Sequence, residues 1–297
     1  MKFQTSPAPH IGTNTGSDAI KSMFIASLLP VIFSSAYFFG FYALLIILVS
    51  TIGAVLTEII LQKLTKSKIR PRPGTIITGL LLGLILPSSV PLWIPFIGSA
   101  FAVSIGKYAF GVGNNIFNPA LVGRAFLLAA WPAIMTKWAV DGVTSATPLA
   151  AAFEGSKSAV YSSLFFGSVS GSIGETSALA IIIAAIFLLY KKIIDWRTIA
   201  SYIGGVLVLA MVLGQDPVFH ILAGGVLFGA VFMATGYMST PITKNGRLIF
   251  GFGCALLTMI IRIYAGAPEG VTFAILIMNA LTPLIDRYTI PKPFGKK

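Results

Sequence analysis

Charged residues are scarce in this sequence. Of its 297 residues only 10% are charged, whereas 56% are hydrophobic, and the mean hydropathy is +0.89. A water-soluble domain carries about 25% charged residues, so this chain lacks the polar surface that would cover a globule in water. The composition therefore predicts an integral membrane protein.

Side chains that form disulfides or bind metals are scarcer still. The chain has one cysteine, Cys254, and two histidines, His10 and His220, which lie far apart in the sequence. No disulfide framework or thiolate metal cluster is expected from this chain alone, and a self-contained haem or zinc site is not expected either. The first 20 residues are polar, and the first apolar run is long enough to remain as a span, so no cleavable signal is predicted.

Long apolar runs dominate the rest of the chain. The runs at 22–39, 41–61 and 177–190 each approach the roughly 20 apolar residues that cross a bilayer as a helix. They are continuous rather than alternating in polarity, which argues against a membrane β-barrel. We therefore expect an all-α integral membrane protein with about ten transmembrane helices, at residues 22–39, 41–62, 75–87, 92–110, 118–135, 174–190, 198–214, 219–236, 248–265 and 271–285.

The net charge of +12 is unevenly distributed between alternate loops. If the N-terminus is cytoplasmic, the loops on that side hold nearly all the Lys and Arg residues, and the outer loops hold only Lys137 and Lys157. This asymmetry follows the positive-inside rule, so the lipid bilayer explains the charge better than nucleic acid does. We expect a multi-pass protein of a prokaryotic cytoplasmic membrane with both termini in the cytoplasm.

Ten segments divide into two sets of five that run in opposite directions. The chain is therefore expected to form a single membrane domain, 1–297, with repeat one at about 22–135, an outer loop at 136–173, and an inverted repeat two at about 174–285. The third segment, 75–87, is too short to cross as a plain helix. Short, interrupted segments at matching positions in two halves point to a site near the membrane midplane.

Small residues recur in the two interrupted segments. Gly79 and Gly83 have the same spacing as Gly225 and Gly229 five segments later. A midplane site and simple close packing of helices explain this spacing equally well. The fifth segment also opens with FNPALVGRAF, and the tenth carries MNALTPLID, so each combines an Asn with a Pro.

Glu58 and Arg124 are two of the few ionisable residues within the apolar segments. A charge at this depth costs about 3 kcal/mol or more and is a functional candidate by default. Both residues fall toward the cytoplasmic side of the expected topology, so they are expected to be able to pair. The alternative for Arg124 is a side chain that extends to the interface or caps carbonyl groups. No ladder of acidic residues crosses the apolar zone, so this chain alone is not expected to form a complete proton or sodium path.

The outer loop at 136–173 is the one long loop, and it contains the stretch DGVTSATPLA at 141–150. Asp-Gly followed by Thr-Ser predicts a turn. Thr147 precedes Pro148, so it is held in extended conformation with its hydroxyl available to solvent. Such a hydroxyl is an attachment point for a covalent group, although an ordinary Ser/Thr-rich turn is the simpler interpretation of these residues alone.

This stretch resembles a known modification motif. Asp141, Thr144, Ser145, Ala146 and Thr147 match the D-x-x-T-S-A-T flavinylation motif of the Rnf and sodium-pumping NADH:quinone oxidoreductase families. The stretches RPRPGTIITGLLLGLILP (70–87), GVGNNIFNPALVG (111–123) and the N-terminal SPAPHIG also resemble these families, in the expected order over most of the chain. The D subunits of Rnf complexes are more similar than the B subunits of the quinone reductases, which have a longer N-terminus.

The resemblance implies flavin cofactors. FMN would be bound covalently, by a phosphoester bond to Thr147, through a flavin transferase that acts outside the cytoplasmic membrane. Asp141 and Thr144 would be recognition or orienting residues, and Ser145 and Ala146 would leave the backbone open to that enzyme. The family also suggests a second, non-covalent flavin, riboflavin, among the helices, with Phe117–Arg124 (including Asn118 and Arg124) and the 75–83 helix as its expected walls.

The resemblance also implies a function within a larger assembly. The chain would be a subunit, not active alone, of a translocase that moves electrons between ferredoxin and NAD and couples this to Na⁺ or H⁺ movement. Its partners would be the other membrane and peripheral subunits of an Rnf-type complex. Two alternatives are a small-solute channel or secondary transporter with an inverted-repeat fold, and a structural anchor with a vestigial flavin site. The presence of Thr147 in the motif favours the redox function.

Overall fold

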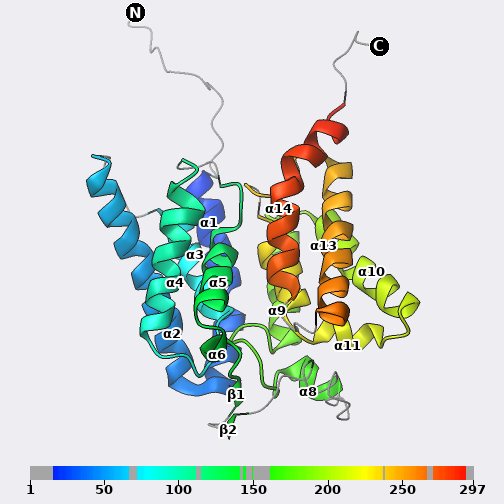
Figure 1. Ribbon diagram of the computed structural model, residues 1–297, viewed down its shortest axis with the longest axis horizontal. Coiled ribbons are helices and arrows are strands. Elements are labelled where there is room, and N and C mark those ends of the chain that lie inside the picture. The colour runs from blue at the N-terminus through cyan, green and yellow to red at the C-terminus, as the bar shows by residue number, and fades with distance from the viewer. Residues whose placement is uncertain are drawn as a thin grey trace, which may run out of the picture.

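The computed structural model describes residues 16–66, 72–111, 115–140, 143–144, 149, 161–236, 238–265 and 270–291. Within these residues the chain is a bundle of helices, as Figure 1 shows. The strands found there are Ala139–Val140 (β1) and Val143–Thr144 (β2), two residues each, which pair antiparallel as a small hairpin. The expectation of an all-α architecture is confirmed.

The elements before residue 140 form what we call the N-terminal half. In chain order they are α1 (Ser17–Ser27), α2 (Leu29–Leu64), α3 (Pro73–Leu84), α4 (Trp93–Val103), the π-helical turn η1 (Ser104–Tyr108), α5 (Pro119–Ala130) and α6 (Pro132–Met135). The expected segment at 118–135 is therefore broken at Trp131, because Pro132 lacks the amide hydrogen that would continue α5.

The elements after residue 160 form the C-terminal half. They are α8 (Tyr161–Phe166), α9 (Ala178–Tyr190), α10 (Trp196–Val212), α11 (Pro217–Leu222), α12 (Val226–Phe228), the π-helical turn η2 (Gly229–Met233), α13 (Lys244–Tyr264) and α14 (Gly270–Thr289). In this half α10 packs against α13, and α13 packs against α14.

Three helical stretches in the described part of the chain are long and apolar enough to cross a membrane: Ser17–Leu64, Lys244–Tyr264 and Gly270–Thr289. The first of these is interrupted at Gly40, whose φ of 71° and ψ of −167° lie outside the helical region. Glycine adopts such a conformation without the steric penalty of a Cβ atom. The break falls between the expected segments 22–39 and 41–62. Four shorter apolar helices, α3, α5, α9 and α10, accompany the long ones.

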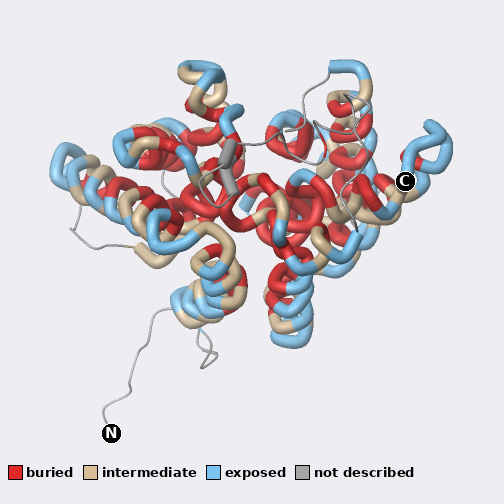
Figure 2. Tube along the Cα trace, turned by 90° about the horizontal axis from the view of Figure 1, so that it is seen from below, coloured by how far each residue is buried: buried red, intermediate tan, exposed pale blue. Residues whose placement is uncertain are grey.

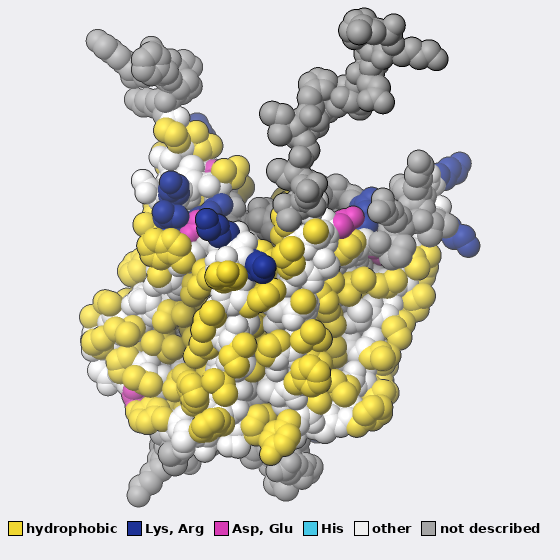
Figure 3. All heavy atoms as spheres, turned by 180° about the vertical axis from the view of Figure 1, so that it is seen from behind, with side chains coloured by type: hydrophobic (Ala, Val, Ile, Leu, Met, Phe, Trp, Pro, Cys, Tyr) yellow, Lys and Arg dark blue, Asp and Glu magenta, His cyan; other side chains and the backbone are white. Residues whose placement is uncertain are grey.

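The two ends of the bundle differ in charge. The start of α1 and the end of α14 lie at one end, and α6, the β1–β2 hairpin and α8 lie at the other (Figure 1). We call these the terminal end and the hairpin end. Lys and Arg side chains gather near the terminal end, above a broad hydrophobic band (Figure 3). The ends therefore differ as the loop pattern of the sequence predicts.

Burial follows the pattern expected for a protein surrounded by lipid. Buried residues concentrate where the helices meet in the middle of the bundle, and exposed residues lie on the periphery (Figure 2). Many of the exposed side chains are large and apolar, including Phe33 at 71%, Phe41 at 72% and Val212 at 76%. Apolar surface of this extent would be unfavourable in water and is stabilised by contact with hydrocarbon.

Close packing explains the two glycines of α3. A Cβ atom at Gly79 would lie 2.6 Å from Thr51 Cα, and one at Gly83 would lie 2.8 Å from Ile47 Cα, so α3 and α2 approach closely along this face. The hydroxyl of Ser50 donates a hydrogen bond to the Gly79 carbonyl at 2.8 Å. The packing interpretation of the small residues is therefore confirmed for this pair.

A buried, non-helical segment follows α3. The amide of Ile173 donates to the Leu86 carbonyl at 3.0 Å, and the amide of Gly174 donates to the Leu84 carbonyl at 2.6 Å. Pro87 and Ser172 form an antiparallel bridge beside them. An extended backbone away from water must find partners within the protein. Here the partner is a segment of the C-terminal half, which ties the two halves together through main-chain bonds.

The second interruption of a helix separates α11 from α12. Gly224 and Gly225 have φ values of 67° and 73°, which end α11 and start α12 in a new direction. The fully buried guanidinium of Arg262 donates to the carbonyls of His220 at 2.8 Å, Ala223 at 3.0 Å and Gly224 at 2.6 Å. The break is thus real, and a cationic side chain satisfies carbonyls that the helix leaves without intrahelical partners.

Candidate functional site

Two asparagines meet at the boundary between the halves. Asn118 caps α5, its Oδ1 accepting from the Ala120 amide at 3.1 Å. The backbone amide of Asn118 donates to Asn279 Oδ1 on α14 at 3.0 Å, and Asn279 Nδ2 donates to the Ser239 carbonyl at 3.1 Å. Both side chains are buried. These bonds connect the Asn of the fifth expected segment with the Asn of the tenth.

A cavity lies beside this contact, toward the terminal end. We call it the asparagine cavity, and its volume is about 140 Å³. Of the residues expected to surround a second flavin, 117–119 and part of α3 line this cavity, whereas Arg124 does not. Its lining residues are Ile20, Lys21, Phe24, Gly74, Ile77, Thr78, Leu81, Asn115, Phe117, Asn118, Pro119, Ile193, Ile194, Phe232, Thr235, Gly236, Met238 and Ser239.

The asparagine cavity combines apolar walls with a few polar groups. The rings of Phe24 and Phe232 meet edge to face, with centroids 5.8 Å apart. Asn115 Oδ1 is buried and accepts no hydrogen bond from the described residues. A buried acceptor without a donor costs about 1–3 kcal/mol, which a bound molecule with an N–H or O–H group would offset. Small-molecule sites typically have this composition.

The expectation that Glu58 and Arg124 can pair is wrong. Arg124 Nη1 instead contacts Glu175 Oε1 at 2.8 Å, and Nη2 donates to Ser172 Oγ at 3.3 Å. Glu58 pairs with Lys107 of η1, whose Nζ lies 3.1 Å from Glu58 Oε1. The reason is geometric, because the end of α2 packs against η1, whereas α5 directs Arg124 toward the C-terminal half.

The Arg124–Glu175 pair opens onto a second cavity, toward the hairpin end, which we call the ion-pair cavity. The Glu175 carboxylate lies against Gly225, where a Cβ atom would be 2.7 Å from Glu175 Cδ. The glycine is therefore required by close approach as well as by its φ angle. The cavity is lined by Arg124, Trp138, Leu164, Val169, Ser170, Gly171, Ser172, Glu175, Thr176, Leu222, Ala223, Gly224, Val271 and Thr272.

The proposed flavin attachment residue, Thr147, lies outside the described residues, as do Asp141, Ser145 and Ala146. Thr144 is described only as part of the backbone of β2. Two described neighbours in sequence lie next to the ion-pair cavity. Trp138, directly before β1, lines it, and Leu149 belongs to the hydrophobic cluster that contains the lining residues Leu164 and Ala223.

A polar contact at the hairpin end holds α8 near α11. The Tyr161 hydroxyl donates to Asp216 Oδ2, and Asp216 Oδ1 accepts from the amides of Val218 and Phe219 at the start of α11. The hydrogen bond from Tyr161 is the largest influence lowering the pKa of Asp216 below its ordinary value, and the two amides add to it. Contact with Asp216 raises the pKa of Tyr161.

Sequence reasoning missed three residues of these sites: Glu175, Arg262 and Asn115. Arg262 lies within an expected membrane segment, so the rule that flagged Arg124 would also have flagged it. Glu175 is one of the nine acidic residues of the chain and stands at the end of a Ser/Gly-rich stretch. Asn115 lies in the family-like stretch at 111–123, but nothing within that stretch singles it out, because its cavity is formed by segments that are far apart in the chain.

These features define an all-helical membrane protein with buried ionic and amide groups where its two halves meet. The chain belongs to the NQR2, RnfD, RnfE family, whose model matches residues 4–295. The resemblance seen in the sequence motifs is therefore confirmed.

Similar proteins include components of ion-translocating redox complexes. The chain is 44% identical over 305 residues to the D subunit of the Na(+)-translocating ferredoxin:NAD(+) oxidoreductase complex of Acetobacterium woodii, covering 99% of this chain and 96% of that protein. It is 39% identical over 320 residues to the proton-translocating counterpart of Clostridium ljungdahlii, covering 99% and 97%. It is 41% identical over 239 residues to the B subunit of the Na(+)-translocating NADH-quinone reductase of Chromohalobacter salexigens, covering 73% and 58%.

Proposed function

We propose that this chain is the D-type membrane subunit of an ion-translocating ferredoxin:NAD oxidoreductase complex of the Rnf type. The observation that carries the proposal is its similarity, over nearly its whole length, to relatives named as the D subunits of such complexes. In this role the chain acts with partner subunits, relays electrons between ferredoxin and NAD, and contributes to Na⁺ or H⁺ translocation.

The proposal includes a single membrane domain with ten spanning segments in two inverted repeats. It is supported by the breaks at Gly40 and at Gly224–Gly225, which fall within or between expected segments. The contact between Asn118 and Asn279 is also consistent with an axis relating the halves. We place the terminal end in the cytoplasm, because the Lys and Arg residues gather there (Figure 3).

Thr147 is proposed to carry FMN on the opposite side of the membrane. The phosphate of FMN would be esterified to the Thr147 hydroxyl by a flavin transferase. A bound flavin takes up and releases electrons singly or in pairs, which suits a relay between one-electron and two-electron carriers. Among the described residues, Trp138 and Leu164 would limit water near this loop, and the Arg124–Glu175 pair supplies the charged wall of the adjoining cavity.

The asparagine cavity is the proposed site of a second, non-covalent flavin, riboflavin. The chemistry of its residues fits such a ligand, because Asn115 Oδ1 offers a buried acceptor to a ring N–H group. The cavity volume of about 140 Å³ would have to increase to hold a whole flavin. Phe24, Phe117 and Phe232 supply aromatic surface beside which a flat ring can pack. Thr78 and Ser239 supply hydroxyl groups at the same cavity, and the Thr78 hydroxyl already bonds the Gly74 carbonyl at 3.0 Å.

Interrupted membrane helices can offer unwound carbonyl groups to a coupling ion. At the α11–α12 break these carbonyls accept hydrogen bonds from Arg262. After α3, the carbonyls of Leu84 and Leu86 accept from Gly174 and Ile173. A Na⁺ site at either place would therefore require these bonds to exchange first.

Mass spectrometry of the Thr147 peptide tests the proposed function most directly. The chain would be purified from its native membrane, in cells that contain the flavin transferase, beside a Thr147→Ala variant. We expect the mass of FMN on the wild-type peptide and its absence from the variant. An unmodified Thr147 under these conditions would contradict the relay function and would favour the transporter alternative.

A further inference from the structure

A basic cleft opens at the terminal end, next to the asparagine cavity, with which it shares the lining residues Ile193, Ile194 and Thr235. It lies between the α9–α10 connection and the 235–247 region, and its volume is about 760 Å³. Three cationic side chains and one carboxylate line it: Lys192, Arg197, Arg247 and Asp195. The remaining lining residues are Leu189, Ile193, Ile194, Trp196, Thr198, Thr235, Thr240, Pro241 and Ile242.

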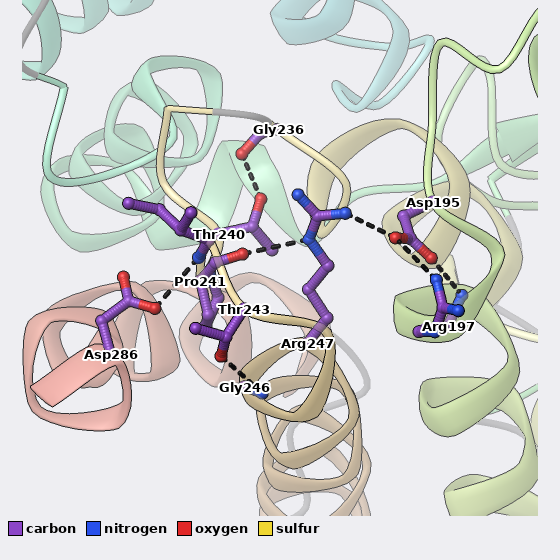
Figure 4. A network of polar contacts seen from close by, with 10 residues as sticks. Asp195, Arg197, Gly236, Thr240, Pro241, Thr243, Gly246, Arg247 and Asp286 are labelled. Carbon is purple, nitrogen blue, oxygen red and sulfur yellow. Dashed lines mark hydrogen bonds and ion pairs between the residues drawn. The ribbon is translucent and has the colours of Figure 1, made fainter. Parts of the chain in front are cut away.

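Two guanidinium groups converge on one carboxylate in this cleft (Figure 4). Arg247 Nη1 and, at 3.4 Å, Arg197 Nη1 both contact Asp195 Oδ2. Arg247 Nε donates to the Pro241 carbonyl at 3.1 Å. The Nη2 atom of each arginine has no partner in the part of the chain that the structure describes, and both side chains remain about 30% exposed, at 28% and 31%. Asp195 therefore neutralises part of the positive charge and leaves N–H donors available.

The side of the cleft formed by residues 240–242 is held in place by α14. The Ile242 amide donates to Asp286 Oδ1 at 3.0 Å, and the Gly246 amide donates to the Thr243 hydroxyl at 3.0 Å, which caps α13 (Figure 4). The Thr240 hydroxyl donates to the Gly236 carbonyl. A site whose walls are fixed before binding loses less conformational entropy when a ligand arrives.

The rim of the cleft is apolar and aromatic. Trp196 is 57% exposed, Ile242 is 76% exposed and the neighbouring Tyr190 is 80% exposed. The Arg197 guanidinium lies over the Trp196 ring, 5.1 Å from its centroid. Trp and Tyr side chains with one apolar and one polar side concentrate at the membrane–water interface. A small free anion would not be stabilised by contact with an apolar rim. A lipid would be, because its acyl chains lie directly below its phosphate.

We propose that this basic cleft binds the phosphate of an anionic phospholipid. Arg247, Arg197 and Lys192 donate to the phosphate oxygens, because guanidinium groups match phosphate geometry and a lysine adds a point charge. Trp196 and Ile242 contact the upper part of the acyl chains. Asp195 competes with the lipid for the two arginines, so it sets the affinity. Basic pockets between membrane helices are established sites for anionic headgroups.

The test measures lipid binding to the purified membrane complex after its bound lipid has been exchanged for detergent. Palmitoyl-oleoyl phosphatidylglycerol in mixed micelles is the probe, and the zwitterionic phosphatidylcholine of the same chains is its control. Bound lipids are counted by native mass spectrometry. We expect retention of phosphatidylglycerol over phosphatidylcholine, a loss of affinity of about tenfold in Arg247→Gln, and a loss of about fivefold in Lys192→Gln.

Three variants keep the interpretation clear. Lys192→Gln removes a side chain for which no hydrogen bond or ion pair is seen among the described residues, so a weaker affinity in it does not come from misfolding. Arg287→Gln removes a cation from the last turn of α14 outside the cleft and should leave binding unchanged. Asp195→Asn keeps a capping side chain for α10 but releases both arginines, so it should bind phosphatidylglycerol about fivefold more tightly.

Each opposite result overturns the proposal. Equal binding of the two lipids, or weaker binding in Asp195→Asn, would show that the cluster serves only to hold the helices. If inorganic phosphate bound to the complex as tightly as phosphatidylglycerol does, the lipid would be rejected as the source of the phosphate. Loss of a partner subunit from Arg247→Gln with unchanged lipid binding would assign the cleft to a protein contact instead.

Discussion

The backbone amide of Asn118 donates to the side-chain oxygen of Asn279, 3.0 Å away, across the boundary between the two halves of the protein. Asn118 also contacts the Met233 carbonyl, through Nδ2 at 3.3 Å. One pair of amide side chains therefore fixes α5, α14 and the end of η2 relative to one another. The asparagine cavity owes its shape to this contact.

Replacing Asn279 with Ala should destabilise the protein. The buried Asn118 amide would lose its acceptor, at a cost of about 1–3 kcal/mol. The Ser239 carbonyl would keep the hydrogen bond from the Thr282 hydroxyl. The midpoint of thermal unfolding of the detergent-solubilised chain measures the effect. Leu281→Ala, on the exposed side of the same helix, is the control and should shift the midpoint less. An unchanged midpoint in Asn279→Ala would show that water or another group replaces the amide.

The Arg124–Glu175 pair should show strong energetic coupling. Arg124→Gln leaves the Glu175 carboxylate, whose side chain is 14% exposed, without its partner. The loss should be smaller than the roughly 3–5 kcal/mol that breaking a fully buried pair costs. Adding Glu175→Gln to the same chain removes the uncompensated charge, so the double variant should recover part of that loss. A double-mutant cycle on unfolding free energies gives the coupling. Additive effects of the two substitutions would mean that Glu175 is neutralised elsewhere.

Arg262→Met should loosen the break between α11 and α12 without opening the whole bundle. The carbonyls of His220, Ala223 and Gly224 lose their donor, while the methionine still fills much of the volume. Hydrogen–deuterium exchange should rise at residues 220–226 and stay constant in α3. Arg262→Lys, which keeps a cation and donors at this position, should restore most of the protection. If exchange in the Arg262→Met variant rose equally at residues 220–226 and in α3, the idea that Arg262 stabilises only the α11–α12 break would be contradicted.

Asn115→Ala separates the two proposed flavins. Removing the buried acceptor should lower the amount of flavin extracted by mild denaturation, while covalent flavin fluorescence on the denatured chain stays unchanged. Thr147→Ala should give the reverse pattern. If both flavins fall together in Asn115→Ala, the variant disturbs the fold and Asn115 has no specific role in the cavity.

The contact between Asp216 and Tyr161 at the hairpin end should be sensitive to acid. The pKa of Asp216 in the folded protein is lowered from the ordinary value of 3.8, chiefly by the Tyr161 hydroxyl. Its contribution to stability is therefore complete above the unfolded value and is lost as the pH falls below 3.8 toward the folded value. Asp216→Asn should remove this part of the acid transition, as followed by the fluorescence of the chain between about pH 5 and about pH 2. An identical transition in the variant would assign the acid sensitivity to other carboxylates.

The sequence alone predicted the helical class, most segment boundaries and the charge difference between the ends, because these depend on composition and on charges within single segments. It did not predict the ion pairs. The fifth segment is apolar around most of its circumference, so the pattern does not reveal which side Arg124 faces. Its partner, Glu175, is 51 positions away, in a loop that the expected segment 174–190 had included, since α9 begins only at Ala178.

The two pairs of glycines show the same limit. Gly79 and Gly83 allow α2 to approach α3, whereas Gly225 adopts a positive φ and makes room for the Glu175 carboxylate. Gly229 allows close packing against Val271 of α14, as the α3 glycines do against α2, so Gly225 alone serves a different structural purpose. Only the tertiary structure tells them apart, since the difference depends on what each missing Cβ atom would contact.

The backbone pairing between the segments at 84–87 and 172–174 limits how this protein can move. Together with the Asn118–Asn279 and Arg124–Glu175 contacts, it joins the halves at three places along their boundary. A rocking motion of one half against the other, as in many transporters with inverted repeats, would have to break all three at once. We therefore expect motion coupled to electron transfer to take place in smaller parts of the bundle or at contacts with other chains, rather than between the two halves.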